Sequence, residues 1–315
     1  MASNPFRPEE GTNSLDSEFL RTTWLYGRLF QDYSIENQVH YAPCDQHEVE
    51  RNDIQHNLLQ RVFEGRLIFP PIARPRRILD CGYGTAGWAS DVADQNPSCD
   101  VLGIDVNPWQ PDTVPSNLYL KVDDLNRRFT FDSHSFDLVQ SRMMASGIHS
   151  NRWTDYMRDI LRVLRPGGWC QMIELYYNVQ SDNGSLTNEH ALRRWSRHYI
   201  ESHAGLKDLG VPFRLEAMFR AAGFVDVEHR MIQLPTCAWL TDERNNEIGA
   251  AMSENVQRML SSLAVYPFTA KLGMTPEYVQ DLVKQARAEA RNPGYKAYFP
   301  LYVCIGRKSR SRSRR

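Results

Sequence analysis

One short stretch constrains this chain more than any other: "RRILDCGYGTAGWASDVA" at residues 76–93. An apolar segment leads into Asp80, and Gly82, Gly84 and Gly87 follow within six positions. Glycines after a buried strand let the chain turn sharply and bring backbone N–H groups close to a polar or anionic ligand. An ordinary tight turn with no ligand would be explained by the same glycines, so the stretch has two interpretations. The segments that follow have to decide between the two.

Short apolar runs alternate with helical patterns after residue 76. The helical segments include "GWASDVADQN", "NRWTDYMRDILRVLR" and a third that stops at Gly223. Candidate strands are 78–80, 101–105, 118–121, 136–140 and 169–174, then a sixth strand after Gly223 and a late strand, "AYFPLYVCIGRK". This alternation predicts an α/β fold in which helices cover both faces of a mostly parallel sheet.

Acidic residues stand at the ends of successive predicted strands. Asp105 follows Asp80 by 25 residues, where a carboxylate can accept hydrogen bonds from both ribose hydroxyls of an adenosine. Asp123 and Asp124 follow the third strand and suit the adenine amino group, while the backbone of Leu125 can meet the ring nitrogens. Because the carboxyl ends of parallel strands share one edge, these residues predict an adenosine cofactor there.

Asp80 indicates which adenosine cofactor fits. A dinucleotide fold places a pyrophosphate beside the glycines, and an acid at that point would repel it. The ammonium group of a methionine moiety would instead be attracted. The segments "ILDCGYGTAGW", "GIDVN", "VDDLN", "FDLVQSR" and "LRPGGW", in this order over residues 76–174, resemble the class I S-adenosylmethionine methyltransferases. One departure is Ala86, which stands where that family usually has its third glycine; Gly87 follows it.

The resemblance implies a Rossmann-like, seven-stranded sheet and S-adenosylmethionine as cofactor. Together with the strand-end pattern it gives ten cofactor-binding residues: Asp80, Gly82, Gly84, Asp105, Val106, Asp123, Asp124, Leu125, Gln140 and Arg142. For Arg142, holding the lid or the cofactor carboxylate are the two roles we expect. His56 corresponds to a histidine of related proteins and is expected to pack.

A narrower resemblance covers residues from about Tyr33 to Lys308. "DIQHNLLQRVFEGRL", "DVNPWQPDTVPSNLYLKVDD", "SDNGSL" and "KAYFPLYVCIGRK" are similar to the fungal LaeA-like methyltransferases. That group includes enzymes of secondary-metabolite clusters and nuclear regulators of such clusters. The resemblance therefore implies either methyl transfer to an O, N or C atom of a small natural product, or a regulatory role through protein partners. A nicotinamide-dependent oxidoreductase is a more distant alternative, opposed by Asp80 and by the lack of an SxxYK-like set.

An oxygen or nitrogen acceptor often needs a base to remove its proton. Such a base should lie just past the fourth or fifth predicted strand, where His149, in "MMASGIHSNRW", is the best-placed imidazole and Glu174, at the end of the fifth strand, is the best-placed carboxylate. We expect these two as the catalytic residues. The competing interpretations are an exposed loop histidine at position 149 and, at position 174, a residue that positions substrate or lid.

Two insertions and an N-terminal region do not fit the alternation. We interpret them as a helical lid over the sheet edge, with helices at 48–65, 247–264 and 276–291, the last capped by Thr275. The expected organisation is a disordered arm at 1–18, an N-terminal helical lid at 19–75, a methyltransferase domain at 76–306 with lid insertions at 176–211 and 236–294, and a basic tail at 307–315.

The lid segments are rich in aromatic residues, including Trp195, Tyr199 and Tyr266. They either form the core of the lid or wall a roomy apolar pocket for a polyketide, terpenoid or indole-type acceptor.

The charge is unevenly spread over the chain. Net charge is −1, yet the last nine residues hold six basic residues and no acid. The acidic remainder argues against nucleic acid as a partner, while the tail is either solvated or a nuclear-import segment. Six scattered cysteines with no CxxC pair predict no metal site, no disulfide framework and a reducing compartment. With no apolar run long enough to span a membrane, we expect the cytoplasm, with the nucleus as the alternative.

Overall fold

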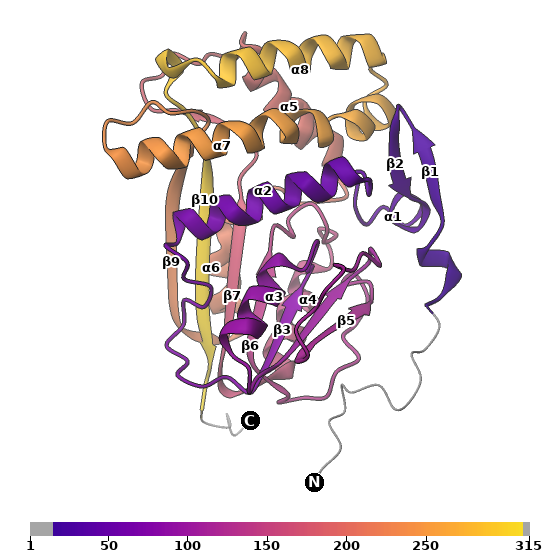
Figure 1. The fold of residues 1–315 in the computed structure, drawn as a ribbon, viewed down its shortest axis with the longest axis vertical. Helices are drawn as coiled ribbons and strands as arrows, with labels where there is room; N and C mark the ends of the chain where they lie inside the picture. Colours follow the sequence, from indigo (N-terminus) through magenta and orange to yellow (C-terminus); the bar gives the residue numbers. More distant parts are fainter. Residues whose placement is uncertain (1–14, 311–315) are drawn as a thin grey trace.

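The computed structural model describes residues 15–310, and its centre is one mixed sheet (Figure 1). The strand order is β5-β4-β3-β6-β7-β10, with β9 on the outer side of β10 and β8 beside the start of β10. Strands β3 to β7 are parallel, and β10 runs antiparallel to both β7 and β9. The strands are β3 (Arg77–Cys81), β4 (Asp100–Asp105), β5 (Leu118–Val122), β6 (Phe136–Arg142), β7 (Leu164–Leu175), β8 (Gln180–Ser181), β9 (Phe224–Pro235) and β10 (Ala297–Lys308).

The seven predicted strands are therefore confirmed, and the two-residue β8 is an addition to them. Their apolar character has a simple cause, because helices cover both faces. Ile78 packs with α3 (Gly87–Gln95) on one face, while its neighbour Leu79 packs with α4 (Trp153–Val163) and α6 (Val211–Ala222) on the other. This three-layer arrangement confirms the predicted Rossmann-like α/β fold.

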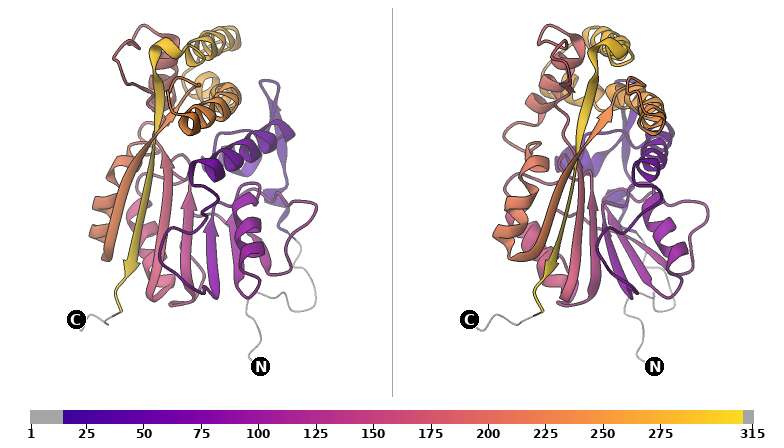
Figure 2. Two further views of the ribbon diagram at one scale, coloured as in Figure 1. Left: turned by 60° about the vertical axis from the view of Figure 1, so that its left-hand side comes forward. Right: turned by 90° about the vertical axis from the view of Figure 1, so that its left-hand side faces the viewer.

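A layer of helices lies beyond the carboxyl ends of the parallel strands (Figures 1 and 2). It consists of α2 (Gln46–Val62), α5 (Ala191–His203), α7 (Glu243–Ser262) and α8 (Pro276–Ala290), with a short π-helix at Pro267–Lys271 and a 3-10 turn at Pro293–Tyr295. Thr275 caps α8 as predicted, since its hydroxyl accepts a hydrogen bond from the Tyr278 N–H at 3.3 Å.

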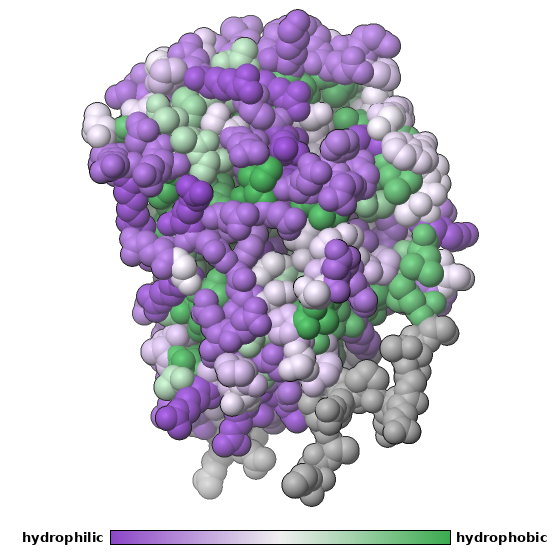
Figure 3. All heavy atoms as spheres, in the orientation of Figure 1, coloured by the Kyte–Doolittle hydropathy of each residue, from purple (hydrophilic) through white to green (hydrophobic). Residues whose placement is uncertain are grey.

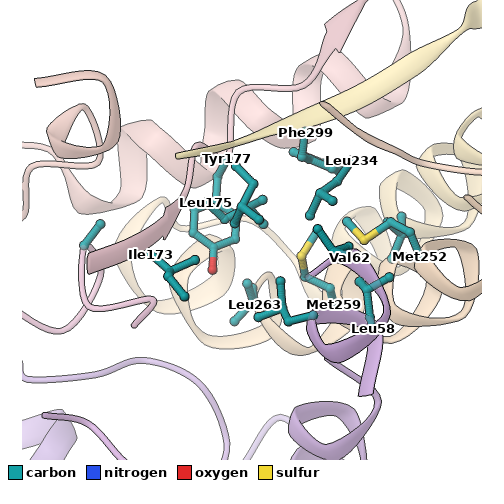
Figure 4. Close-up of a cluster of buried hydrophobic side chains, with 14 of the residues drawn as sticks. Leu58, Val62, Ile173, Leu175, Tyr177, Leu234, Met252, Met259, Leu263 and Phe299 are labelled. Carbon is teal, nitrogen blue, oxygen red and sulfur yellow. The ribbon is translucent and has the colours of Figure 1, made fainter. Parts of the chain in front are cut away.

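The helical layer and the sheet share one hydrophobic core. Figure 4 shows Leu58 of α2, Leu175 of β7, Met259 of α7 and Phe299 of β10 converging there. The aromatic residues of α5 belong to the same core. The rings of Trp195 and Tyr199 stack at 5.2 Å, and the indole N–H of Trp195 donates to the Leu260 carbonyl at 2.8 Å. For these two aromatic residues the structure shows core packing and not a pocket wall.

The N-terminal region begins with a β-hairpin that the sequence analysis did not predict. It comprises a 3-10 turn (Ser17–Phe19), β1 (Thr22–Leu25), β2 (Arg28–Gln31) and the short helix α1 (Asp32–Glu36). The hairpin turns at Tyr26 and Gly27, which both adopt positive φ (53° and 77°), the geometry that favours a tight two-residue turn.

The predicted arm and tail fall mostly outside the described residues, at 1–14 and 311–315. Strand β10 continues to Lys308 and so includes the first two residues of the predicted tail. The face in Figure 3 carries mainly hydrophilic side chains, with small separate hydrophobic groups. Within residues 15–310, no helix combines the length and the apolar character that a membrane span requires.

Candidate functional site

A cavity lies where the carboxyl ends of β3, β4, β5 and β6 meet α2 and the segment before it. Part of its lining comes from the glycine loop and the strand ends, and part from residues 31–55 of the N-terminal region. Seven of the ten predicted cofactor-binding residues line it: Gly82, Gly84, Asp105, Val106, Asp123, Leu125 and Arg142. The predicted edge of the sheet therefore does carry a concave site.

The glycine loop has a backbone that side chains would obstruct. Gly82 and Gly84 adopt φ of 77° and 58°, in the left-handed region. A Cβ on Gly82 would collide with the thioether of Met144, so this position needs glycine for space as well. Ala86 also adopts a positive φ, 60°, which explains why related sequences favour glycine there. At Gly87 a Cβ would lie 2.8 Å from the ring of His56, and the shifted glycine makes room for that ring.

Asp105 holds the loop and also faces the cavity. Its Oδ2 accepts the N–H of Gly84 at 2.9 Å and its Oδ1 accepts the N–H of Asn107 at 2.9 Å. Burial raises the pKa of this carboxyl, and the backbone N–H donors act in the opposite direction. An ionised carboxylate has about four acceptor positions, so two remain for the hydroxyls of a ribose.

The two adjacent acids after β5 have different roles. Asp123 lines the cavity. Asp124 is buried and accepts a hydrogen bond from the Tyr33 hydroxyl at 3.2 Å, which ties the N-terminal region to the sheet edge. Burial, with Asp124 adding to it, raises the pKa of Tyr33 to about 12, so the phenol remains the donor. Of the two acids, only Asp123 lines the cavity, so it alone remains a candidate for the predicted contact with adenine.

Asp80 and Gln140 lie behind the cavity wall, paired across β3 and β6. Asp80 is 3% exposed, and burial raises its pKa to about 7 while Arg142 acts against that rise. The side-chain amide of Gln140 is buried without a hydrogen-bond partner among the described residues. Arg142, at the end of β6, reaches the cavity itself.

The two residues predicted to be catalytic do not line the cavity. His149 Nε2 donates to the Gln38 carbonyl at 3.1 Å, and burial lowers the pKa of its ring. The Glu174 carboxylate is fully buried and accepts the N–H groups of Met144 and Ala145 at 2.8 and 3.0 Å. Burial raises the pKa of Glu174 to about 8. In this geometry both side chains bond backbone groups. The partners of Glu174, Met144 and Ala145, lie outside the predicted lid segments, so its expected role in positioning substrate or lid is not seen.

His40 lines the cavity, and the sequence analysis did not select it. No hydrogen-bond partner of its ring is found within the described residues. Burial lowers its pKa to about 4; Lys207 and Arg51 lower it further, and Glu48 acts in the opposite direction. The ring is therefore neutral near pH 7. A lone histidine in the irregular segment "VHYAPCD" gives no signal of periodicity or spacing, so only the fold reveals it.

A buried ion pair beside His40 was also missed. Arg51 Nη2 lies 2.6 Å from Glu48 Oε1, and both residues line the cavity. Their i,i+3 spacing on α2 gave a weak signal, because such pairs are usually solvent-exposed. Within residues 15–310, no group of three His, Cys, Asp or Glu side chains could hold a metal ion.

The donor set fits a ligand with an adenosine and an amino-acid end. Asp105 offers acceptors to ribose hydroxyls, the glycine loop offers an unobstructed backbone, and Arg142 offers guanidinium donors to a carboxylate. These groups lie on one cavity wall.

Comparison with known proteins agrees with this chemistry. A family model described as "Methyltransferase domain" matches residues 53–229, which is more than half of the chain. The chain is 29% identical over 303 residues to "Methyltransferase pytC" of Aspergillus terreus, covering 95% of this chain and 92% of the relative. It is also 29% identical over 290 residues to "Secondary metabolism regulator laeA" of Aspergillus flavus, covering 90% of this chain and 76% of that relative. The chain belongs to the methyltransferase domain family and is an S-adenosylmethionine-dependent methyltransferase.

Proposed function

We propose that this methyltransferase methylates an oxygen or nitrogen atom of a small natural product of fungal secondary metabolism. The observation that carries the proposal is the continuity of the cavity. It runs from the glycine loop to a compartment under α2 that is lined by Val39, His40, Tyr177 and Leu263. An acceptor has to fit beneath α2 to reach the cofactor edge, which favours a small molecule.

The composition of the compartment indicates the kind of acceptor. Val39, Tyr177 and Leu263 provide apolar surface, while the Glu48–Arg51 pair adds charge at one side. An acceptor with an apolar or aromatic body and at least one polar group would match this lining. This mixed character differs from the roomy apolar pocket that was one of the two interpretations of the aromatic lid segments.

The bound cofactor supplies a methyl group activated by a sulfonium. The chain has to align the acceptor with it and keep water away, and α2 with the segment before it covers the cavity for this purpose. His40 offers a free ring nitrogen, in neutral form, to a hydroxyl or amine proton of the acceptor. We therefore assign to His40 the proton-accepting role expected for His149 or Glu174.

A regulatory role is the second candidate, and one surface feature favours it. The N-terminal segment exposes Leu20, Trp24 and Tyr26, with Trp24 at 69%. Adjoining exposed hydrophobic side chains of this size often mark a contact surface for another protein. In this case the chain would act in the nucleus through a partner and regulate secondary metabolism, which is the role that the name of the laeA relative gives to that protein. For the enzyme we propose the cytoplasm.

The test uses purified protein, cofactor labelled in the methyl group, and small-molecule extract of the producing cells. The enzyme should yield one labelled small molecule, and His40→Gln should reduce its formation at least about tenfold without weakening cofactor binding. His47→Gln, on the exposed side of α2, is the matched control. Label found only in proteins, or no label together with a stably retained partner, would support the regulator. Loss of labelling in His149→Gln and not in His40→Gln would return the base role to His149.

A further inference from the structure

Arg142 has unused hydrogen-bond donors in the cavity. Its guanidinium makes one hydrogen bond within the described residues, from Nη1 to His56 Nδ1 at 3.5 Å, and no carboxylate lies within ion-pair distance. Arginine carries five N–H donors and no acceptor. A largely buried guanidinium that faces a cavity with free donors is a site for an anion, and a carboxylate matches its planar fork best.

His56, on α2, is fixed from two sides. Its Nε2 lies 2.7 Å from Asp91 Oδ2 of α3, and Gln60 also donates to that carboxylate oxygen. The absence of a side chain at Gly87 leaves space for the ring between α2 and α3. The ring is 8% exposed and cannot turn away without losing these contacts.

The partner atoms determine the protonation of the ring. Arg142 can only donate and the Asp91 carboxylate accepts, so Nδ1 of His56 is the acceptor and Nε2 carries the proton, directed at Asp91. The amide nitrogen of Gln60 lies 3.1 Å from the same Nε2, and in this arrangement it donates to Asp91 and not to the ring. Burial and Arg142 lower the pKa of His56, while Asp91 and Asp53 act in the opposite direction. His56 is therefore neutral at pH 7.

We propose that His56 is a positioning residue that holds Arg142 so that its free donors receive the carboxylate at the amino-acid end of the cofactor. Asp80 lies behind the same wall, and its carboxyl interacts electrostatically with Arg142. The consequence is that α2, a helix of the lid, forms part of the cofactor site. Protonation of His56 would place an N–H against the Arg142 guanidinium, so binding of the carboxylate should weaken on the acid side of neutrality. This inference rests on the methyltransferase assignment and adds to it.

The experiment compares two cofactor fragments by calorimetry. S-adenosylhomocysteine carries the amino-acid end, and methylthioadenosine lacks it. His56→Ala and Arg142→Gln should each weaken S-adenosylhomocysteine about tenfold, the loss expected for one charge-assisted hydrogen bond, and leave methylthioadenosine nearly unchanged. The double variant should lose little more than either single one, because the two residues act as a unit. His47→Ala, on the exposed side of the same helix, should change neither affinity.

A conservative variant separates positioning from general packing. His56→Asn keeps an acceptor near the place of Nδ1 and should restore most of the affinity for S-adenosylhomocysteine, without the acid-side decline seen in the wild type. Equal losses for both fragments, or no loss for S-adenosylhomocysteine, would overturn the proposal. If the wild-type protein bound neither fragment, the result would contradict the methyltransferase assignment as well as the role of His56.

Discussion

Asp105 gives the sharpest test of the cofactor site. Its carboxylate accepts hydrogen bonds from the N–H groups of Gly84 and Asn107, at 2.9 Å each. Its remaining acceptor positions are available to a ligand in the cavity. Two charge-assisted hydrogen bonds to ribose are worth roughly 1.5–3 kcal/mol each. Asp105→Ala should therefore cost about 3 kcal/mol or more of binding free energy, which is a loss of about 100-fold or more in the affinity for S-adenosylmethionine. Isothermal titration calorimetry measures this directly.

The matched control is Asp100→Ala, at the opposite end of the same strand. Its carboxylate lies 4.0 Å from Arg77 in a partly exposed pair, so the change should cost little and leave cofactor affinity intact. Thermal unfolding of both variants shows whether the loop that Asp105 holds has been lost with the carboxylate. A folded Asp105→Ala protein with wild-type affinity would refute the assignment of this strand end to ribose.

Three further predictions concern stability. Removing residues 309–315 should change the unfolding midpoint much less than truncation after Gly306, because Lys308 is the last residue of β10 and its ammonium bonds two backbone carbonyls. A fluorescent fusion that lacks residues 309–315 tests nuclear import. Trp195→Ala should lower the free energy of unfolding, measured by chemical denaturation, by about 3–5 kcal/mol. The substitution leaves a cavity at a fully buried position and removes the hydrogen-bond donor of the Leu260 carbonyl. Burial raises the pKa of Glu174 from 4.5 to about 8, so the folded state holds a proton that the unfolded state releases between these values. Stability should fall as pH rises through that window, and Glu174→Gln should flatten the dependence.

The sheet could be predicted because its strands carry a local signal. Strands covered on both faces read as short apolar runs, and β4 ends at Asp105 as predicted. Strand β7 begins at Leu164 and not at 169, because the strand continues through Pro166 and Gly167, two residues that usually end one. Residues that act by backbone conformation, such as Gly82, were predictable for the same local reason.

The acceptor side could not be predicted, because its contacts join residues far apart in the sequence. His149 was chosen for its place after a strand, yet its ring is taken up by the carbonyl of Gln38, 111 residues away. The ring of His40, by contrast, has no hydrogen-bond partner among residues 15–310 and lines the cavity. The periodicity of a sequence cannot report which of two histidines a distant segment will cover.

The N-terminal region is bound to the cofactor edge at several independent points. Gln31 donates to the Val106 carbonyl at 2.9 Å, and the ammonium of Lys207 joins the carbonyls of Val39 and Gly147 at 3.0 Å each. The cavity therefore has two walls of different origin: one from the strand ends and one from residues 31–55. Since we propose that the second wall meets the acceptor, substitutions there should change which molecule is methylated while cofactor affinity persists. His56, which follows that wall on α2 and contacts Arg142, should instead affect cofactor affinity.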